Sequence, residues 1–382
     1  MTRVEQVVTD RTNTNVLDFP GLPFWRGVLA RPGLTDVLPF RLVWDQHGFC
    51  RQAASADVTE RVVSEYGSGE YVHITPPPGS ASEWADRFGL LQADFVEKNA
   101  RKGGQILEIG AGTLFLARRL TPRLAAERYV VADPAVTSGE GIAEVVSSYF
   151  PADSLQGRKF RTILAFNSLE HCEDPVAFLS AIGRHLEVGG RGIICAPDVA
   201  NQFAIHDLNA LVHEHISYFT PETFDCLARQ CGLRVVSATS DEDTLWAVVE
   251  AAEPDPGSVA RLPWLFASAK AAMLANLTKK AGMVAEHARR GAVAFHGATP
   301  GLNNFLHLAG MTGRSDIALF DGDAQKAGRY LPACASPILH TEDPRYATAP
   351  VIFVSAMTFF EPIRRFSTAR RGAGATLIPL FE

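Results

Sequence analysis

The feature that most restricts the fold of this chain is a regular alternation of apolar runs and amphipathic stretches between residues 105 and 251. Strands are predicted at 105–109, 129–132, 162–166, 192–195, 233–239 and 244–251, and helices at 84–99, 114–120, 175–186 and 221–231. Strands that alternate with helices form a mostly parallel sheet covered by helices on both faces. We therefore expect an α/β domain over residues 81–252.

The segments on either side of this domain have different patterns. Residues 1–80 lack a sustained period and are interrupted by prolines, including Pro76-Pro77-Pro78, so we expect a small irregular N-terminal cap. A composition break at 253–257 opens an Ala-rich helical connector over 253–290, with its helix from 259 onward. Strands expected at 293–297, 317–321, 351–355 and 375–380, with a helix at 302–309, predict a second, Rossmann-like α/β domain over 291–382.

Composition and charge limit what the chain can bind. Its 382 residues are 47% hydrophobic with a formal net charge of −6, which argues against a general nucleic-acid binder. It has no apolar stretch of the roughly 18 residues that a membrane span needs, and its first residues show no signal or lipidation motif. A small-molecule partner, no nucleic acid or membrane partner, a cytoplasmic location and a monomer or homodimer are expected. The six cysteines form no Cys-x-x-Cys pair, so no disulfide framework or thiolate zinc site is predicted.

A glycine-containing turn follows the first predicted strand of the α/β domain. In the run from 106 to 113, Glu108 stands near the end of the strand, and Gly110 and Gly112 allow a ligand to approach the backbone closely. A dinucleotide fingerprint would need a third glycine where Phe115 stands, so pyrophosphate binding is disfavoured. Asp133 ends the next strand, where a carboxylate can accept hydrogen bonds from both hydroxyls of a ribose.

His213-Glu214-His215 places two imidazoles and a carboxylate directly before Ile216-Ser217-Tyr218-Phe219. An imidazole, with its pKa near ~6.5, exchanges protons at neutral pH, and a neighbouring carboxylate can fix its tautomer. A zinc-binding helix would need a second histidine four positions later, and Ser217 or Phe219 stands there instead. The segment therefore predicts proton-transfer chemistry, with a structural role in a polar turn as the alternative.

Four ordered motifs resemble those of class I S-adenosylmethionine-dependent methyltransferases. They are the Glu-x-Gly-x-Gly turn at 108–112, Asp133, the Leu-Glu-His segment at 169–171 with Asp-Pro at 174–175, and the Leu-x-x-Gly-Gly turn at 186–190. The resemblance implies that S-adenosylmethionine is the cofactor and S-adenosylhomocysteine its product. It assigns cofactor binding to Glu108, Gly110, Gly112, Asp133 and Asn167, with Glu108 near the sulfonium end.

A narrower resemblance covers nearly the whole chain. The segment from His213 to Phe219 is similar to the His-Glu-His-x-Ser-Tyr-Phe signature of the nucleotide-sugar C-methyltransferases, and the stretches 297–303, 321–332 and 374–379 are similar to their C-terminal domain. Members of that family methylate a carbon next to the ketone of a deoxy-sugar carried by a nucleoside diphosphate. The resemblance therefore implies such an acceptor and a role in deoxysugar and antibiotic biosynthesis.

The same resemblance implies roles for individual side chains. His215 would remove the proton from the acceptor carbon and Glu214 would orient it, while His171 would donate a hydrogen bond to the enolate oxygen and Tyr71 would reach the site from the cap. His213, Tyr218, Lys326 and Arg329 are expected to contact the acceptor, the last two at its diphosphate. The competing interpretations are a packed aromatic for Tyr71, structural support for His213, and solvated charges for Lys326 and Arg329.

The N-terminal cap departs from the family pattern. The family normally holds zinc there with two Cys-x-x-Cys pairs, whereas Trp44 and His47 stand where a pair would fall. No zinc is expected, and the cap would fold on apolar contacts alone. That module normally helps to enclose the acceptor, so its altered sequence leaves the identity of the acceptor open. An O-, N- or C-methyltransferase of a non-sugar metabolite is therefore the alternative function. A non-catalytic cofactor-binding scaffold predicts a broken cofactor turn, yet Glu108, Gly110, Gly112 and Asp133 are present.

Overall fold

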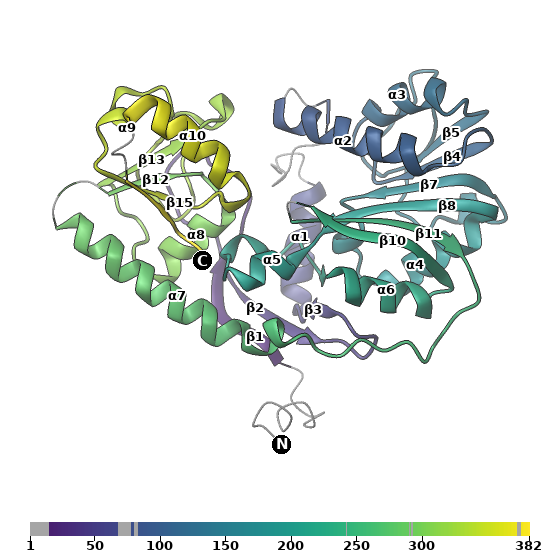
Figure 1. Ribbon diagram of the computed structural model, residues 1–382, viewed down its shortest axis with the longest axis horizontal. Coiled ribbons are helices and arrows are strands. Elements are labelled where there is room, and N and C mark those ends of the chain that lie inside the picture. Colours follow the sequence, from purple (N-terminus) through teal and green to yellow (C-terminus); the bar gives the residue numbers. More distant parts are fainter. Residues whose placement is uncertain are drawn as a thin grey trace.

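The computed structural model describes residues 15–67, 78–79, 83–241, 243–289, 291, 293–372 and 376–382. Its strands form sheets of four, seven and five strands. Figure 1 shows two lobes, each built on one of the larger sheets, with the smaller N-terminal sheet between and below them. Among the described residues, no helix has the length and apolar character needed to cross a membrane.

The seven-stranded sheet carries the predicted α/β domain. In spatial order its strands are β10 (Leu233–Asp241), β11 (Thr244–Ala251), β8 (Leu186–Pro197), β7 (Phe160–Phe166), β4 (Gln105–Ile109), β5 (Arg128–Ala132) and β6 (Glu144–Val146). The strands from β8 to β6 are parallel, whereas β10 and β11 are antiparallel. Helices α2 (Glu83–Asn99) and α3 (Phe115–Arg123) cover one face, and α4 (Pro175–His185) and α6 (Pro221–Gln230) cover the other (Figure 1). The predicted α/β fold is confirmed.

Side-chain caps fix the helices that follow the two histidine-bearing loops. Asp174 accepts a hydrogen bond from the backbone N–H of Ala177 (2.8 Å), and Pro175 occupies the first turn of α4. Thr220 and Thr223 form a reciprocal capping box at the start of α6. The loops that carry His171 and His215 therefore run into helices with fixed starting points.

The N-terminal part is more regular than the sequence predicts. Strands β1 (Asn15–Pro23), β2 (Val37–Trp44) and β3 (Cys50–Gln52) form an antiparallel sheet, joined by β9 (Ser217–Tyr218), and helix α1 (Ala56–Gly67) follows. The prediction of an irregular cap was wrong for this region because prolines inside β1 hide its strand pattern. Proline is tolerated there since β1 is the edge strand and its register shifts between Phe19 and Leu22.

The five-stranded sheet confirms the second, Rossmann-like α/β unit. Its parallel strands are, in order, β14 (Ile338–His340), β13 (Ile317–Asp321), β12 (Val293–His296), β15 (Val351–Val354) and β16 (Thr376–Pro379). Helices α8 (Pro300–Leu308), α9 (Pro344–Thr348) and α10 (Phe360–Arg371) accompany it. The connector forms helix α7 (Trp264–Ala288), which begins five residues later than the predicted 259.

One hydrophobic core joins the N-terminal sheet, α7 and the C-terminal sheet. It contains Leu17 and Phe40 from the first, Phe266 from the second and Phe295 from the third, all nearly inaccessible to solvent. Two backbone hydrogen bonds between Leu29 and Tyr330 (2.8 and 2.9 Å) also connect the loop between β1 and β2 with the loop between β13 and β14. The cap is therefore packed into the C-terminal half of the chain.

The two residues that stand where a zinc-binding cysteine pair would fall make other contacts. The ring of Trp44 lies 6.2 Å from that of Phe266 on α7, and Nδ1 of His47 lies 3.0 Å from Oε1 of Gln230 on α6. Cys50 is fully buried in the shared core, and burial raises the pKa of its thiol far above the usual value. Apolar packing and ordinary hydrogen bonds hold this sheet to its neighbours.

Candidate active site

Adjacent parallel strands deliver the predicted cofactor residues to one edge of the large sheet. Gly110 follows β4, Asp133 follows β5 and Asn167 follows β7, so all three lie at carboxyl ends of neighbouring strands. Gly110 and Gly112 have positive φ angles of 68° and 60°. A Cβ atom on Gly110 would lie 2.2 Å from Oγ of Ser168, so only glycine fits this turn.

Asp133 holds the turn in place. Its Oδ2 accepts a hydrogen bond from the backbone N–H of Gly112 (2.8 Å), and its Oδ1 accepts one from Ala135 (2.7 Å). The residue is 5% exposed, and a carboxylate has further lone pairs that can accept ribose hydroxyls. A turn without side chains beside this carboxylate fits the nucleoside part of S-adenosylmethionine.

Glu108 lies beneath the turn, inside the sheet. The hydroxyl of Tyr129 on β5 donates a hydrogen bond to its Oε2 (2.7 Å). Burial raises the pKa of Glu108 to about 7, although the hydrogen bond from Tyr129 opposes that rise. The carboxyl group is therefore poised between its neutral and charged forms at neutral pH.

Asn167 has the left-handed backbone conformation, with φ 48°, at the point where β7 ends. Its backbone N–H donates to the carbonyl of Cys195 (2.8 Å), and its Oδ1 accepts a hydrogen bond from Nε2 of Gln92 on α2 (3.5 Å). The next residue, Ser168, donates from Oγ to the carbonyl of Ile109 (3.2 Å). These bonds attach the start of the His171 loop to the cofactor turn.

Glu170, His171 and His215 form a cluster beside this turn. The last two lie on different loops, yet their rings are 5.2 Å apart and meet edge to face. Nε2 of His171 is 3.7 Å from Oε1 of Glu170, and one side-chain atom from each of the three residues lies within 4.8 Å of the others. Such a group suits either proton sharing or a divalent cation, and no other group of this kind is found in the described ranges.

The electrostatics of the cluster are set by burial. Glu170 is 2% exposed, and burial raises its pKa to about 8. Burial, together with the neighbouring His171, lowers the pKa of His215 well below its usual value. At neutral pH the cluster therefore holds a neutral carboxylic acid next to an unprotonated imidazole at His215, which favours proton exchange over cation binding.

The backbone of the His-Glu-His segment is held from several sides. Nε2 of Gln52, on β3, donates to the carbonyls of His213 (3.2 Å) and His215 (3.3 Å). The N–H of Ile216 donates to the carbonyl of Glu170 (2.7 Å), and the segment then enters β9, which pairs with β3. The N-terminal sheet thus fixes the position of His215.

The other two residues of the predicted triplet point to different surroundings. The ring of His213 lies 5.7 Å from Phe24 and 5.4 Å from Phe40, with Nε2 3.3 Å from the carbonyl of Leu38. Burial lowers its pKa to about 4. Glu214 is 8% exposed, and its carbonyl lies 2.9 Å from Nδ1 of His171.

Tyr218 is fully buried in β9, with its ring 6.3 Å from His215 and its hydroxyl donating to the carbonyl of Val212 (3.4 Å). Tyr71 lies outside the residues that the structure describes. The structure thus brings together His171 and His215 from the predicted set, and places His213 in the packing of the N-terminal sheet.

Lys326 and Arg329 lie in the C-terminal unit, at a turn that resembles the cofactor turn. Gly297 follows β12 with φ 105°, and the N–H of Ala298 donates to Oδ2 of Asp321 at the end of β13 (2.8 Å). The equivalent bond in the cofactor turn, from Gly112 to Asp133, has the same length. Nζ of Lys326 lies 3.1 Å from Oδ2 of Asp321, and Arg329 is exposed.

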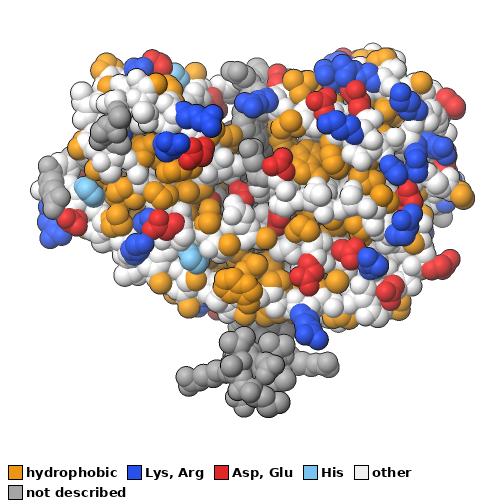
Figure 2. Space-filling model, in the orientation of Figure 1, with side chains coloured by type: hydrophobic (Ala, Val, Ile, Leu, Met, Phe, Trp, Pro, Cys, Tyr) orange, Lys and Arg blue, Asp and Glu red, His pale blue; other side chains and the backbone are white. Residues whose placement is uncertain are grey.

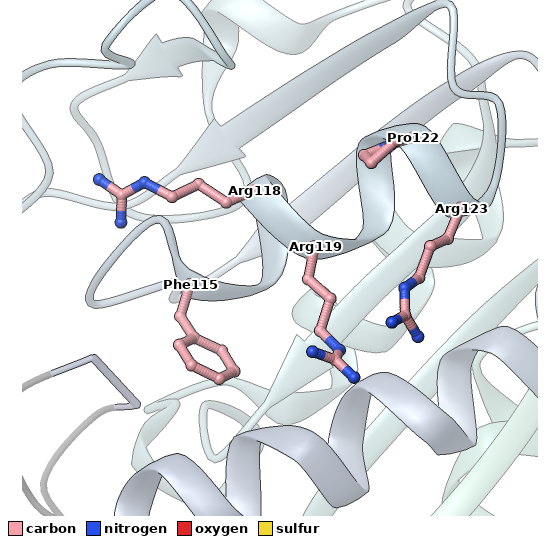
Figure 3. A pocket seen from close by; sticks show the side chains of 5 residues that line it. All are labelled: Phe115, Arg118, Arg119, Pro122 and Arg123. Atoms are coloured by element: carbon pink, nitrogen blue, oxygen red, sulfur yellow. The ribbon is translucent and has the colours of Figure 1, made fainter.

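A separate hollow of about 440 Å³ lies on α3, lined by Phe115, Arg118, Arg119, Pro122 and Arg123. In Figure 3, Arg119 and Arg123 point toward the neighbouring helix, and Arg123 forms an ion pair with Glu97 of α2 (2.5 Å). Figure 2 shows basic and acidic side chains mixed over this region. The hollow includes none of the cluster residues, and exposed ion pairs of this kind contribute little to stability or chemistry.

The comparison with known families covers the part of the chain just described. Residues 83–238 match the profile of the methyltransferase domain. This region is an S-adenosylmethionine-dependent methyltransferase domain. It contains the glycine turn, Asp133, Asn167 and both clustered histidines, so the chain is a methyltransferase. No curated protein matches its sequence.

Several solved structures resemble part of this methyltransferase at low identity. A methyltransferase from Clostridium acetobutylicum is 12% identical, with 44% of this chain and 100% of that chain covered and a TM-score of 0.35. The CcbJ methyltransferase from Streptomyces caelestis is 19% identical, with 48% and 94% covered and a TM-score of 0.36. The N-methyltransferase NodS from Bradyrhizobium japonicum, solved with S-adenosylhomocysteine, is 19% identical, with 51% and 99% covered and a TM-score of 0.34.

Sequence reasoning missed the chemical importance of Glu170 and of Ser168. Glu170 lies in the Leu-Glu-His segment and Ser168 directly before it, and the sequence assigns a role there to His171 alone. The sequence did carry a signal, because Glu170 is a charged residue next to a histidine in the loop that follows an apolar strand, at the sheet edge where ligands bind. Its burial, which gives Glu170 its chemistry, is visible only in the fold.

Proposed function

We propose that this methyltransferase methylates the carbon next to the ketone of a nucleotide-linked deoxy-sugar in specialised-metabolite biosynthesis. The pairing of His171 with His215, beside the cofactor turn, carries the proposal. The serine that starts the His171 loop contacts the backbone of that turn (3.2 Å). A base and a hydrogen-bond donor are therefore next to the place where a methyl donor binds.

Residues of the sheet edge would hold the cofactor. Gly110 and Gly112 leave room for the cofactor, and Asp133 would accept hydrogen bonds from its ribose hydroxyls. Glu108 and Asn167 flank the turn. S-adenosylmethionine supplies an electrophilic methyl group on a sulfonium centre. The protein must supply an acceptor carbon with enough electron density to attack it.

His215 is suited to take the proton from that carbon. Its imidazole is unprotonated at neutral pH, since burial and the neighbouring His171 lower its pKa. Removal of the proton leaves an enolate, whose oxygen must be stabilised by a donor. We assign this role to His171 on the opposite loop, whose Nδ1 lies 2.9 Å from the backbone carbonyl oxygen of Glu214. Acceptors that react at oxygen or nitrogen do not form an enolate, so two clustered imidazoles favour C-methylation.

The C-terminal unit offers a second place for a nucleotide. Its Gly297 turn and Asp321 repeat the hydrogen-bond pattern with which the cofactor turn and Asp133 face a ribose. Lys326 beside Asp321, and exposed Arg329, add positive charge of the kind that binds a diphosphate. These features support a nucleotide-linked acceptor over a free sugar or a phenol.

The proposal is tested with methyl-labelled S-adenosylmethionine and a panel of nucleotide-linked 4-keto deoxy-sugars, read by mass spectrometry. We expect at least one of them to gain a methyl group on carbon. His215→Ala should abolish both methyl transfer and solvent deuterium exchange at the acidic carbon. His307→Ala, on α8, is the matched control and should retain both. Methyl transfer to a phenol or amine with none to the keto-sugars, or unchanged exchange in His215→Ala, would refute the proposal.

A further inference from the structure

Glu170 is a buried carboxyl group to which the proposed mechanism gives no task. Its side chain is 2% exposed, and Oε2 has no hydrogen-bond partner among the described residues. Burial without a partner disfavours the charged carboxylate strongly and the neutral acid much less. The raised pKa of Glu170, about 8, agrees with this, so the group carries a proton at neutral pH.

The imidazole of His171, when neutral, carries its single hydrogen on Nδ1. Its Nδ1 lies 2.9 Å from the carbonyl oxygen of Glu214, and a carbonyl can only accept, so Nδ1 carries the hydrogen. A neutral His171 therefore has a lone pair on Nε2, the atom 3.7 Å from Oε1 of Glu170. In that form it cannot donate a hydrogen bond from Nε2 to an enolate oxygen. It needs one more proton.

Few of the described groups around Glu170 can accept its proton. Cys172 follows the same loop, and Cys195 lies on β8; both thiols feel the charge of Glu170. Burial raises the pKa of Cys172 to about 12 and raises the pKa of Cys195 well above its usual value, so both thiols stay protonated at neutral pH. The opposite loop contributes His215 and its neighbour Glu214. Among the described residues, His171 and His215 are the bases whose side chains lie within 4.8 Å of Glu170.

We propose that Glu170 is the internal acid of this site and passes its proton to Nε2 of His171 while His215 takes the proton from the acceptor carbon. This inference rests on the proposed function. A C–H bond of the acceptor and the O–H bond of Glu170 break, and one N–H bond forms on each imidazole. No net charge is created, because the enolate faces the His171 cation and the Glu170 carboxylate faces the His215 cation.

The arrangement also explains how a histidine with a lowered pKa acts as a base. The carboxylate that forms at Glu170 lies in the same cluster as His215 and stabilises its imidazolium. After methyl transfer the ketone re-forms, and the proton of His171 returns to Glu170. The proton of His215 leaves to solvent and is the one proton that the overall reaction releases.

The test compares Glu170→Gln with wild type over a range of pH. Wild-type methyl transfer should fall above about pH 8, as Glu170 loses its proton. Glu170→Gln keeps the size of the side chain without a transferable proton, so its rate should fall ~100-fold and the alkaline fall should vanish. Glu173→Gln, an exposed neighbour, is the matched control and should keep both the rate and the alkaline fall. A slow Glu170→Gln that retains the fall above pH 8, or one with an unchanged rate, overturns the proposal.

A measurement without acceptor separates this inference from the proposed function. The carboxyl ¹³C signal of Glu170, assigned by its loss in Glu170→Gln, should titrate near pH 8 together with the ring ¹⁵N signals of His171 in the cofactor-bound protein. Independent titration of the two groups refutes the shared proton, whatever the acceptor. Coupled titration in a protein that methylates none of the keto-sugars refutes the proposed acceptor alone. Thermal unfolding and cofactor affinity, unchanged in Glu170→Gln, confirm that the variant is folded.

Discussion

Asn209, in the short helix η4 (Leu208–Ala210), joins the methyltransferase domain to α8 of the C-terminal unit. Its Oδ1 accepts a hydrogen bond from the N–H of Gly301 (2.7 Å), and its Nδ2 donates to the carbonyl of Ser355 (2.9 Å) and to Asp207 (2.7 Å). Gly301 is the second residue of α8, and a Cβ there would lie 2.5–2.7 Å from the amide group of Asn209. The two positions are therefore predicted to be strongly coupled.

The size of the coupling follows from these contacts. Asn209→Ala leaves the N–H of Gly301 without a partner and removes one of the two hydrogen bonds to the carbonyl of Ser355, which keeps the one from the N–H of Met357 (3.1 Å). The loss of these two bonds amounts to about 2 kcal/mol at roughly 1 kcal/mol each. Gly301→Ala alone pushes the same amide aside, so a similar loss is expected. With Ala at 209 the clash disappears, and Ala in place of Gly gains about 1 kcal/mol of helix propensity. The double variant should thus be at least as stable as Asn209→Ala, with a coupling of about 2–3 kcal/mol.

The assay is a double-mutant cycle on the opening free energy of α8, measured by amide hydrogen exchange in native protein. A local measurement is needed because a chain with three sheets is not expected to unfold in one step. If Gly301→Ala destabilises α8 equally in both backgrounds, so that the effects add within about 0.5 kcal/mol, the contact assigned to Asn209 is refuted.

Four further predictions concern the sites described above. Gly110→Ala should weaken S-adenosylmethionine binding at least ~10-fold in calorimetry, because the added Cβ would clash with Ser168. Gly141→Ala, at a similar φ of 73° but with open space around it, should leave binding unchanged, and equal losses of affinity in both variants would contradict the steric argument. The pKa of His213 is about 4 in the folded state, below its unfolded value, so the unfolded chain binds more protons between pH 4 and 6.5 and stability falls as the pH falls through that window. In denaturant titrations, His213→Phe should remove on the order of 3 kcal/mol of this loss of stability, and an unchanged pH dependence in the variant would disprove the assignment. Lys326→Ala should raise KM for the nucleotide-linked acceptor ~10-fold with little change in kcat, in contrast to Lys270→Ala on the exposed face of α7; a change in kcat alone would argue against a binding role. Chelator treatment should leave methyl transfer unchanged, because the zinc-pair positions Trp44 and His47 are engaged in other contacts, and loss of activity restored by metal would show otherwise.

The sequence predicts the buried strands of the two larger sheets well. The bounds of β4, β11 and β13 agree with the apolar runs at 105–109, 244–251 and 317–321. Such strands are buried on both faces and read as continuous apolar stretches that end at glycine or acidic residues. The N-terminal strands fail this test. Strand β1 is an edge strand with prolines, and β9, which pairs with β3, is two residues long and lies about 165 positions further along the chain than β3.

The candidate site is partly visible in the sequence for a similar reason. Gly110, Gly112 and Asp133 occupy spacings that the backbone geometry of a parallel sheet requires, and the structure places them at one edge. The convergence of His171 with His215 depends on two loops of different origin, so no local pattern predicts it from physics alone. The chemistry of Glu170 comes from burial, which depends on every element packed around it.

The shared core of the N-terminal sheet, α7 and the C-terminal sheet limits how this protein can be recombined with its relatives. A chimera that exchanges only residues 291–382 would cut through the packing of Leu17, Phe40, Phe266 and Phe295 and leave apolar surface exposed. An exchange that keeps the core intact must carry residues 15–52 and α7 together with the C-terminal sheet, and it must preserve the pairing of β3 with β9 that positions His215. The proposed acceptor-binding residues and the proposed catalytic base are therefore inherited as one unit, although they lie in different halves of the chain.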